Sequence, residues 1–164
     1  MELKRPTVAV PVRVALVGRD AVAAEIFVPS RPRQGKTQVL DDIADMLTES
    51  TGFLPVRFTT GVRLLAKHAL AWISVQPEAA ELAVELEFDD LPSEVVTLYD
   101  REHHVEVELV SGGPLRGAMF DSAPADRPRV IDHLNGTSSF VRLWTEGEHF
   151  LVNKAQIVAV SEVG

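Results

Sequence analysis

One segment of this 164-residue sequence occurs twice, and the repeat limits the possible folds more than any other feature. Residues 105–120 read VEVELVSGGPLRGAMF and align with residues 12–27, VRVALVGRDAVAAEIF. Further along, the offset between the copies settles at 87 positions, and the matched pairs are Asp45 with Asp132, Leu47 with Leu134, Phe53 with Phe140, Leu64 with Leu151, Lys67 with Lys154 and Ser74 with Ser161. A tandem repeat encodes one structural unit in successive copies, so we expect two modules, 1–76 and 77–164.

Each module is predicted to contain short strands and one helix. Apolar residues alternate with other residues from Thr7 to Gly18, which is the period of a strand with one buried face. The first module continues with a returning strand, a helix and two more strands, expected at 22–28, 39–47, 53–59 and 62–75. The second module repeats this plan, with a helix and two final strands expected at 126–135, 140–145 and 149–163. The predicted fold class is mainly β (α+β), as two tandem small β-barrels, each with one short helix between its second and third strands.

Charge and composition exclude several classes of function. The net charge of −8 repels phosphate groups, so we expect neither DNA nor a membrane as a partner. No segment reaches the roughly 18 apolar residues of a membrane helix, and the start of the chain lacks the apolar core of an export signal, so we expect a cytoplasmic protein. Cysteine is absent, which removes disulfides, thiolate catalysis and cysteine-based zinc sites. Acidic residues gather in 77–100, where we expect a connecting strand.

The second module carries residues that resemble a known family. A helix pattern Arg-x-x-Asp-x-Leu-Asn, a strand beginning with Phe and a Val-Asn-Lys turn are supplied by Arg129, Asp132, Leu134, Asn135, Phe140, Val152, Asn153 and Lys154. This pattern resembles an uncharacterised family of small bacterial β domains. The resemblance implies a fold and no activity. The first module departs from it, with Met46-Leu47-Thr48 and Leu65-Ala66-Lys67 at the corresponding places.

Two other stretches resemble the Sm and Hfq proteins, which are small five-stranded barrels. Residues 105–120 have a similar Gly turn and Leu-Arg-Gly step, and residues 66–75, AKHALAWISV, are similar to the Lys-His-Ala turn and last strand of Hfq. This resemblance implies that Lys67 and His68 contact RNA from the pore of a ring. Lys154 holds the equivalent position in the second module. RNA binding is therefore an alternative function, which the negative net charge opposes.

A basic loop lies between the second strand and the helix of the first module. Residues 30–37, SRPRQGKT, contain Arg31, Arg33 and Lys36 and approximate a phosphate-binding loop. The loop has Ser30 where that motif has its first glycine, and Pro32 lacks an N–H group that the phosphate would use. The corresponding loop of the second module is shorter and has no such cluster. We expect the basic loop either to meet an acidic partner or to be merely solubilising, and nucleotide binding is a second alternative.

No residue pattern indicates a catalytic centre, a metal site or a cofactor. His103 and His104 are adjacent, so on a strand they point to opposite faces and cannot hold one metal ion together. Each module is so small that its apolar core alone would give only marginal stability, and its strand edges need to be covered. We therefore expect a non-enzymatic protein-interaction or scaffold module that forms a homo-oligomer or binds another protein.

Overall fold

The computed structural model describes residues 7–30, 36–49, 52–76, 101–121, 134–135, 139–145 and 147–163. In chain order the elements within these ranges are β1 (Thr7–Leu16), β2 (Val22–Pro29), α1 (Lys36–Thr48), β3 (Phe53–Phe58), β4 (Gly61–Ala66), η1 (Lys67–Ala69), β5 (Leu70–Val75), β6 (Arg101–Leu109), β7 (Leu115–Asp121), β8 (Phe140–Trp144), β9 (His149–Asn153), η3 (Lys154–Gln156) and β10 (Ile157–Glu162). Most of these residues lie in strands. The predicted mainly β class is therefore confirmed.

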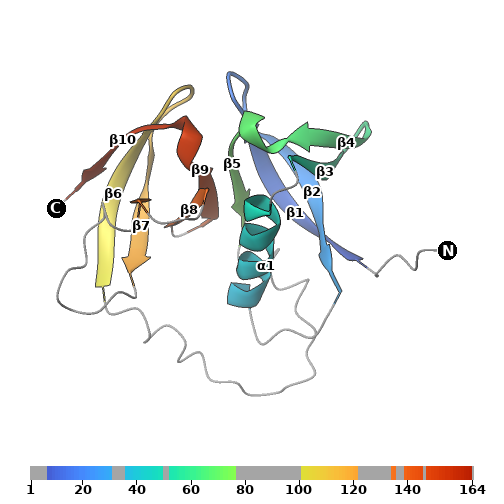
Figure 1. Cartoon of the computed structure of the whole chain (residues 1–164), viewed down its shortest axis with the longest axis horizontal. Helices are drawn as coiled ribbons and strands as arrows, with labels where there is room; N and C mark the ends of the chain where they lie inside the picture. Colours follow the sequence, from blue (N-terminus) through green and yellow to red (C-terminus); the bar gives the residue numbers. More distant parts are fainter. Residues whose placement is uncertain are drawn as a thin grey trace, which may run out of the picture.

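The ten strands form one antiparallel sheet. Its strand order is β10-β6-β7-β8-β9-β5-β1-β2-β3-β4. The strands of the two halves of the chain make two five-strand groups, which lie side by side in Figure 1 and meet where β5 pairs with β9. In this pairing Trp72 lies opposite Val152, and Val75 lies opposite His149. A single hydrogen-bonded sheet thus runs through both halves.

This sheet is not closed, whereas the sequence predicted a small barrel, closed or nearly closed, in each module. Closing the first group on itself would require β5 to pair with β4. Instead β5 has β1 on one side and β9 on the other. A strand has only two hydrogen-bonding edges, so both edges of β5 are already used. The sheet therefore ends at β4 and at β10, each of which has one neighbour among the described strands.

The segments 62–75 and 149–163, each expected to be a single strand, are both divided in two. The three-residue helices η1 and η3 interrupt them at equivalent places. Lys67 N donates to the carbonyl of Gly52 at 2.8 Å, and Lys154 N donates to the carbonyl of Ser139 at 3.0 Å. Each bond ties the turn to the residue just before β3 or β8, so the chain changes direction there and begins a new strand.

The helix α1 follows β2 and precedes β3, and it covers the first five-strand group (Figure 1). Its buried apolar residues recur at helical spacing and are Val39, Leu40, Ile43 and Leu47. The helix expected at 126–135 lies outside the described residues except for Leu134 and Asn135. The acidic connecting strand expected within 77–100 also lies outside them.

Two apolar clusters form the core, and each takes residues from both halves of the chain. The first cluster surrounds α1 and includes Phe140 and Leu151 from the second half. The second cluster includes Ala15, Ala71 and Trp72 from the first half. Burial of these side chains across the β5–β9 pairing makes this junction part of the protein interior, not a linker between independent units.

Candidate functional site

The basic loop residues predicted to bind a partner are only partly placed by the structure. Arg31 and Arg33 lie outside the described residues. Lys36 is the first residue of α1, and its backbone is described. The described residues therefore do not test a site in this loop, and its role stays a prediction.

Lys67, the first residue implied by the Hfq resemblance, is buried within the protein. Only 8% of its surface is exposed. Its ammonium group donates to the carbonyl oxygens of Met46 and Glu49 at the end of α1. The last carbonyls of a helix lack partners within the helix and carry partial negative charge, so a buried lysine satisfies them well. In this structure Lys67 stabilises the C-terminal end of α1.

His68 and Lys154 occupy more open positions. His68 is exposed, and its carbonyl accepts a bond of 3.4 Å from Gln156 Nε2 of η3. Lys154 begins η3 and is half-buried, and this partial burial lowers the pKa of its ammonium group. The turn that the Hfq resemblance implies contacts RNA, η1, is thus joined to its counterpart η3 across the junction.

A shallow groove of about 320 Å³ lies where these turns meet the end of α1. It brings together Lys67, His68 and Asn153, and its other lining residues are Leu47, Glu49, Gly52, Ser139, Phe140 and Ala155. Two of its polar groups already have structural partners. Lys67 bonds to α1, and the buried amide of Asn153 donates to Leu70 O at 2.9 Å. The groove therefore has few unused polar groups with which to orient a ligand.

The junction between β5 and β9 is held by several kinds of contact. The rings of Trp72 and Phe150 meet edge to face with centroids 4.9 Å apart. Arg13 pairs with Glu148 at 2.8 Å, and its guanidinium lies over Trp72 at 5.4 Å from the ring centroid. Asn153 also caps η3, because its Oδ1 accepts from Ala155 N at 3.0 Å. Apolar, ionic and hydrogen-bonding contacts therefore all cross this pairing.

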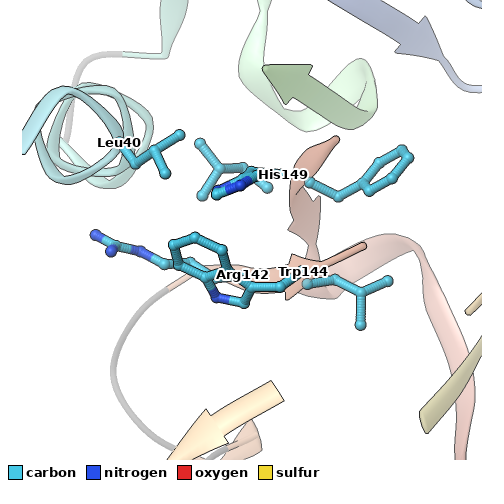
Figure 2. A pocket seen from close by; sticks show the side chains of 7 residues that line it. Leu40, Arg142, Trp144 and His149 are labelled. Carbon is cyan, nitrogen blue, oxygen red and sulfur yellow. The ribbon is translucent and has the colours of Figure 1, made fainter. Parts of the chain in front are cut away.

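A small cavity beside the junction is packed too tightly for a ligand. Figure 2 shows Leu40 from α1 facing His149, Trp144 and Arg142 from the second half. The rings of Trp144 and His149 meet with centroids 4.0 Å apart, and Arg142 pairs with Asp41 of α1 at 2.5 Å. The cavity measures only about 10 Å³, which is at the lower limit of the space that one water molecule requires. It is an imperfection of the packing between the halves.

The two ends of the sheet expose side chains whose equivalents at the junction are buried. Strand β5 is buried at every position, whereas β10, its equivalent at an offset of 87, is exposed or half-buried throughout. Phe140 and Leu151 are 6% and 2% exposed. Their equivalents Phe53 and Leu64 are 61% and 68% exposed. The free ends of the sheet are therefore the most conspicuous apolar surface that the described residues offer.

Comparison with known proteins adds no identification. No family model, curated protein or solved structure matches this chain significantly. The described residues contain no group of three or more His, Asp or Glu side chains that could hold a metal ion. None of the described helices is long and apolar enough to cross a membrane. The candidate site therefore rests on the geometry of the sheet.

Sequence reasoning did not find the exposed residues of the sheet ends. Phe53, Leu64 and Val158 belong to strand patterns in which an apolar residue is expected to be buried. The signal available in the sequence was the repeat itself, because a residue and its equivalent cannot both be at the inner junction of a two-module chain. We had expected edges that need covering, but the sequence alone did not show which strands would form them.

Proposed function

We propose that this protein is a non-enzymatic scaffold module that associates with itself, or with a protein partner, through the end strands of its sheet. The observation that carries the proposal is the exposure of apolar side chains along β4 and β10, each with one neighbour among the described strands. An unpaired strand edge offers N–H and C=O groups to another chain, and exposed apolar residues add a driving force for burial.

We also propose that each five-strand group is a unit of the Sm-like type. The support is that both groups have the same strand order, with the last strand beside the first and a short 3-10 helix just before the last strand. The equivalent hydrogen bonds from Lys67 and Lys154 support the same repeated plan. Superposition of the two groups in an experimental structure tests this part of the proposal, and strand paths that diverge would contradict it.

Self-association is tested by measuring the molar mass of the protein over a range of concentrations. We expect the mass to exceed that of one chain and to rise with concentration. Leu64→Lys on β4 should reduce the mass, because a charged side chain at a strand edge opposes pairing. Val22→Lys is the control, since Val22 is also an exposed apolar residue but lies on the interior strand β2. A single-chain mass at every concentration, with no partner captured, would contradict the proposal.

RNA binding is the second candidate function, and the groove beside His68 is the observation that favours it. Lys67 and His68, which the Hfq resemblance implies contact RNA, both line this groove. His68→Ala is the suitable variant because His68 is exposed, whereas Lys67 holds the end of α1. Filter binding of single-stranded RNA should weaken in His68→Ala and fall steeply as salt is added. Binding that is absent at low salt, or unchanged in His68→Ala, would remove this candidate.

A further inference from the structure

We infer that the chains associate head to tail, with β4 of one chain pairing with β10 of the next in the register seen inside the chain between β9 and β5. This inference rests on the proposed self-association and specifies its partner, its orientation and its register. The internal junction is the template, because each free end strand is the repeat equivalent of one of the two strands that meet there. β4 corresponds to β9, and β10 corresponds to β5.

The repeated strands are held in equivalent surroundings in the two halves. Val17 N donates to the carbonyl of Ala69 at 2.9 Å, and its counterpart Val110 N donates to the carbonyl of Gln156 at 2.9 Å. β5 pairs with β1, and β10 pairs with β6, the counterpart of β1. The free edge of β10 in the second half therefore corresponds to the edge of β5 that pairs with β9 in the first half.

The most exposed apolar side chains are the repeat equivalents of residues that, at the internal junction, pack into the apolar core of the other half of the chain. Phe140 and Leu151 belong to the second half, yet they pack in the first apolar cluster around α1. Their counterparts Phe53 and Leu64 lie on β3 and β4, are exposed, and belong to neither apolar cluster of the described residues. In a head-to-tail contact they would enter the second module of the next chain, as Phe140 and Leu151 enter the first module here. Burial of both side chains would drive the contact.

The free edge of β10, which would pair with β4 of another chain, carries apolar residues that are not fully buried. Leu70 and Ile73 of β5 are fully buried at the internal junction, whereas their counterparts Ile157 and Val160 on β10 are only partly buried against the second cluster. Val158, also on β10, is exposed. A strand added along β10 would complete the burial of this apolar edge. If β10 instead paired with β10 of another chain, the exposed side chains of Phe53 and Leu64 would lie at the far end of each sheet and would stay uncovered by this contact.

The internal junction also dictates the register between chains. Ile73 lies opposite Leu151, and Ser74 lies opposite Phe150. Applying the offset of 87 to both strands places Val160 opposite Leu64, Ser161 opposite Arg63 and Glu162 opposite Val62. Side chains alternate between the faces of a sheet, so a shift of one residue would turn Leu64 away from the cluster that it should enter.

The contact between chains lacks the polar contacts of the internal junction. The counterparts of Arg13 and Glu148, which form an ion pair, are Glu106 and Gly61. The counterpart of Asn153, whose amide crosses the junction, is Ala66. The association should therefore be weaker than the internal pairing and should reverse on dilution. Each chain carries one edge of each kind, so the contact is heterologous and can continue into a ring or a filament.

Two edge variants distinguish this arrangement from the alternatives. Val62→Lys with Leu64→Lys blocks β4, and Val158→Lys with Ala159→Lys blocks β10, and all four residues are exposed. Under the head-to-tail arrangement each variant alone has the mass of one chain in sedimentation velocity, because its remaining edge has no complement. An equimolar mixture should give a mass of two chains, with one copy of each variant.

Other results from these variants would contradict either the head-to-tail arrangement or self-association itself. If one variant alone still forms dimers and mixing adds nothing, like edges pair with each other and the head-to-tail arrangement is wrong. If both variants associate as the wild type does, the contact lies elsewhere. A wild-type protein that stays a single chain at every concentration contradicts self-association itself, so the two failures are distinguishable.

Cysteine crosslinking tests the register, and the natural sequence is well suited to it because it contains no cysteine. Chains carrying Arg63→Cys are mixed with chains carrying Ser161→Cys and oxidised. The inferred register places these positions opposite each other, so a mixed disulfide dimer should form in high yield. Arg63→Cys with Glu162→Cys is the control, because position 162 faces the other side of the sheet. Equal yields from both pairs, or a higher yield from the control, would contradict the register.

Discussion

Asn153 and Leu70 are 83 residues apart in the chain, yet the side-chain amide of Asn153 donates a 2.9 Å hydrogen bond to the carbonyl of Leu70. The bond is buried and links the end of β9 to the start of β5. It therefore closes the internal junction at the end nearest the groove. Because the same side chain caps η3 through Ala155 N, one residue organises both the turn and the pairing of the two halves.

Replacing Asn153 with alanine should lower the free energy of unfolding by about 1–3 kcal/mol, since the Leu70 carbonyl would lose this partner inside the protein. Urea unfolding measured by circular dichroism checks this value. Gln156→Ala is the control, because the 3.4 Å bond from Gln156 to His68 O is exposed and its loss should change stability by less than about 0.5 kcal/mol. Equal effects of the two substitutions would contradict the role given to Asn153.

Lys67→Met should destabilise the protein by about 1.5–3 kcal/mol, the usual contribution of hydrogen bonds from a charged group. Methionine keeps an apolar stem in the buried position but cannot donate to the carbonyls of Met46 and Glu49 at the end of α1. Thermal unfolding followed at a helix-sensitive wavelength checks the loss. His68→Ala, an exposed neighbour in the same turn, should leave the stability nearly unchanged. Full stability of Lys67→Met would show that the end of α1 does not depend on this ammonium group.

Alanine substitution of the equivalent residues Phe140 and Phe53 should affect different properties, folding stability in the first case and self-association in the second. Phe140→Ala removes a buried ring from the first cluster and should cost about 3–5 kcal/mol of folding stability. Phe53→Ala removes an exposed ring, so the stability of a single chain should change by less than about 0.5 kcal/mol. Self-association should nevertheless weaken, as sedimentation at matched concentrations would show. An unchanged dissociation constant for Phe53→Ala would argue against insertion of this ring into a second chain.

Gly117→Ala should destabilise the contact between β7 and β8. A Cβ atom at Gly117 would lie 2.6 Å from the carbonyl oxygen of Trp144 and 2.9 Å from Leu143 Cγ, so one strand would have to move. Such overpacking costs about 1–3 kcal/mol. Gly113→Ala is the matched control, because a Cβ atom there meets no atom within 4 Å. Chemical denaturation should give free energies of unfolding that differ by this amount between the two variants. Equal unfolding midpoints would contradict the close approach of β7 and β8.

The repeat explains why much of the fold could be predicted from the sequence. Matched residues at a constant offset of 87 indicated two copies of one plan, and the structure places β3 and β8, and β5 and β10, at that spacing. Alternation of apolar residues correctly indicated strands, because neighbouring side chains on a strand point to opposite faces. The turns at Lys67 and Lys154 were also identified, although the division of 62–75 and 149–163 into two strands was missed.

By itself, the sequence determined the strand-rich class, the repeated plan and the helical stripe of α1, because these follow from local periodicity and from pairwise matching of residues. Only the tertiary structure decided which strands pair at the junction and which remain at the ends. Backbone N–H and C=O groups are the same in every strand, so β5 and β10 look equivalent until the two halves are placed together. The exposure of Leu64 and the burial of Leu151 follow from that placement, since β9 lies beside β5 of the other half of the chain and β4 has no second neighbour among the described strands.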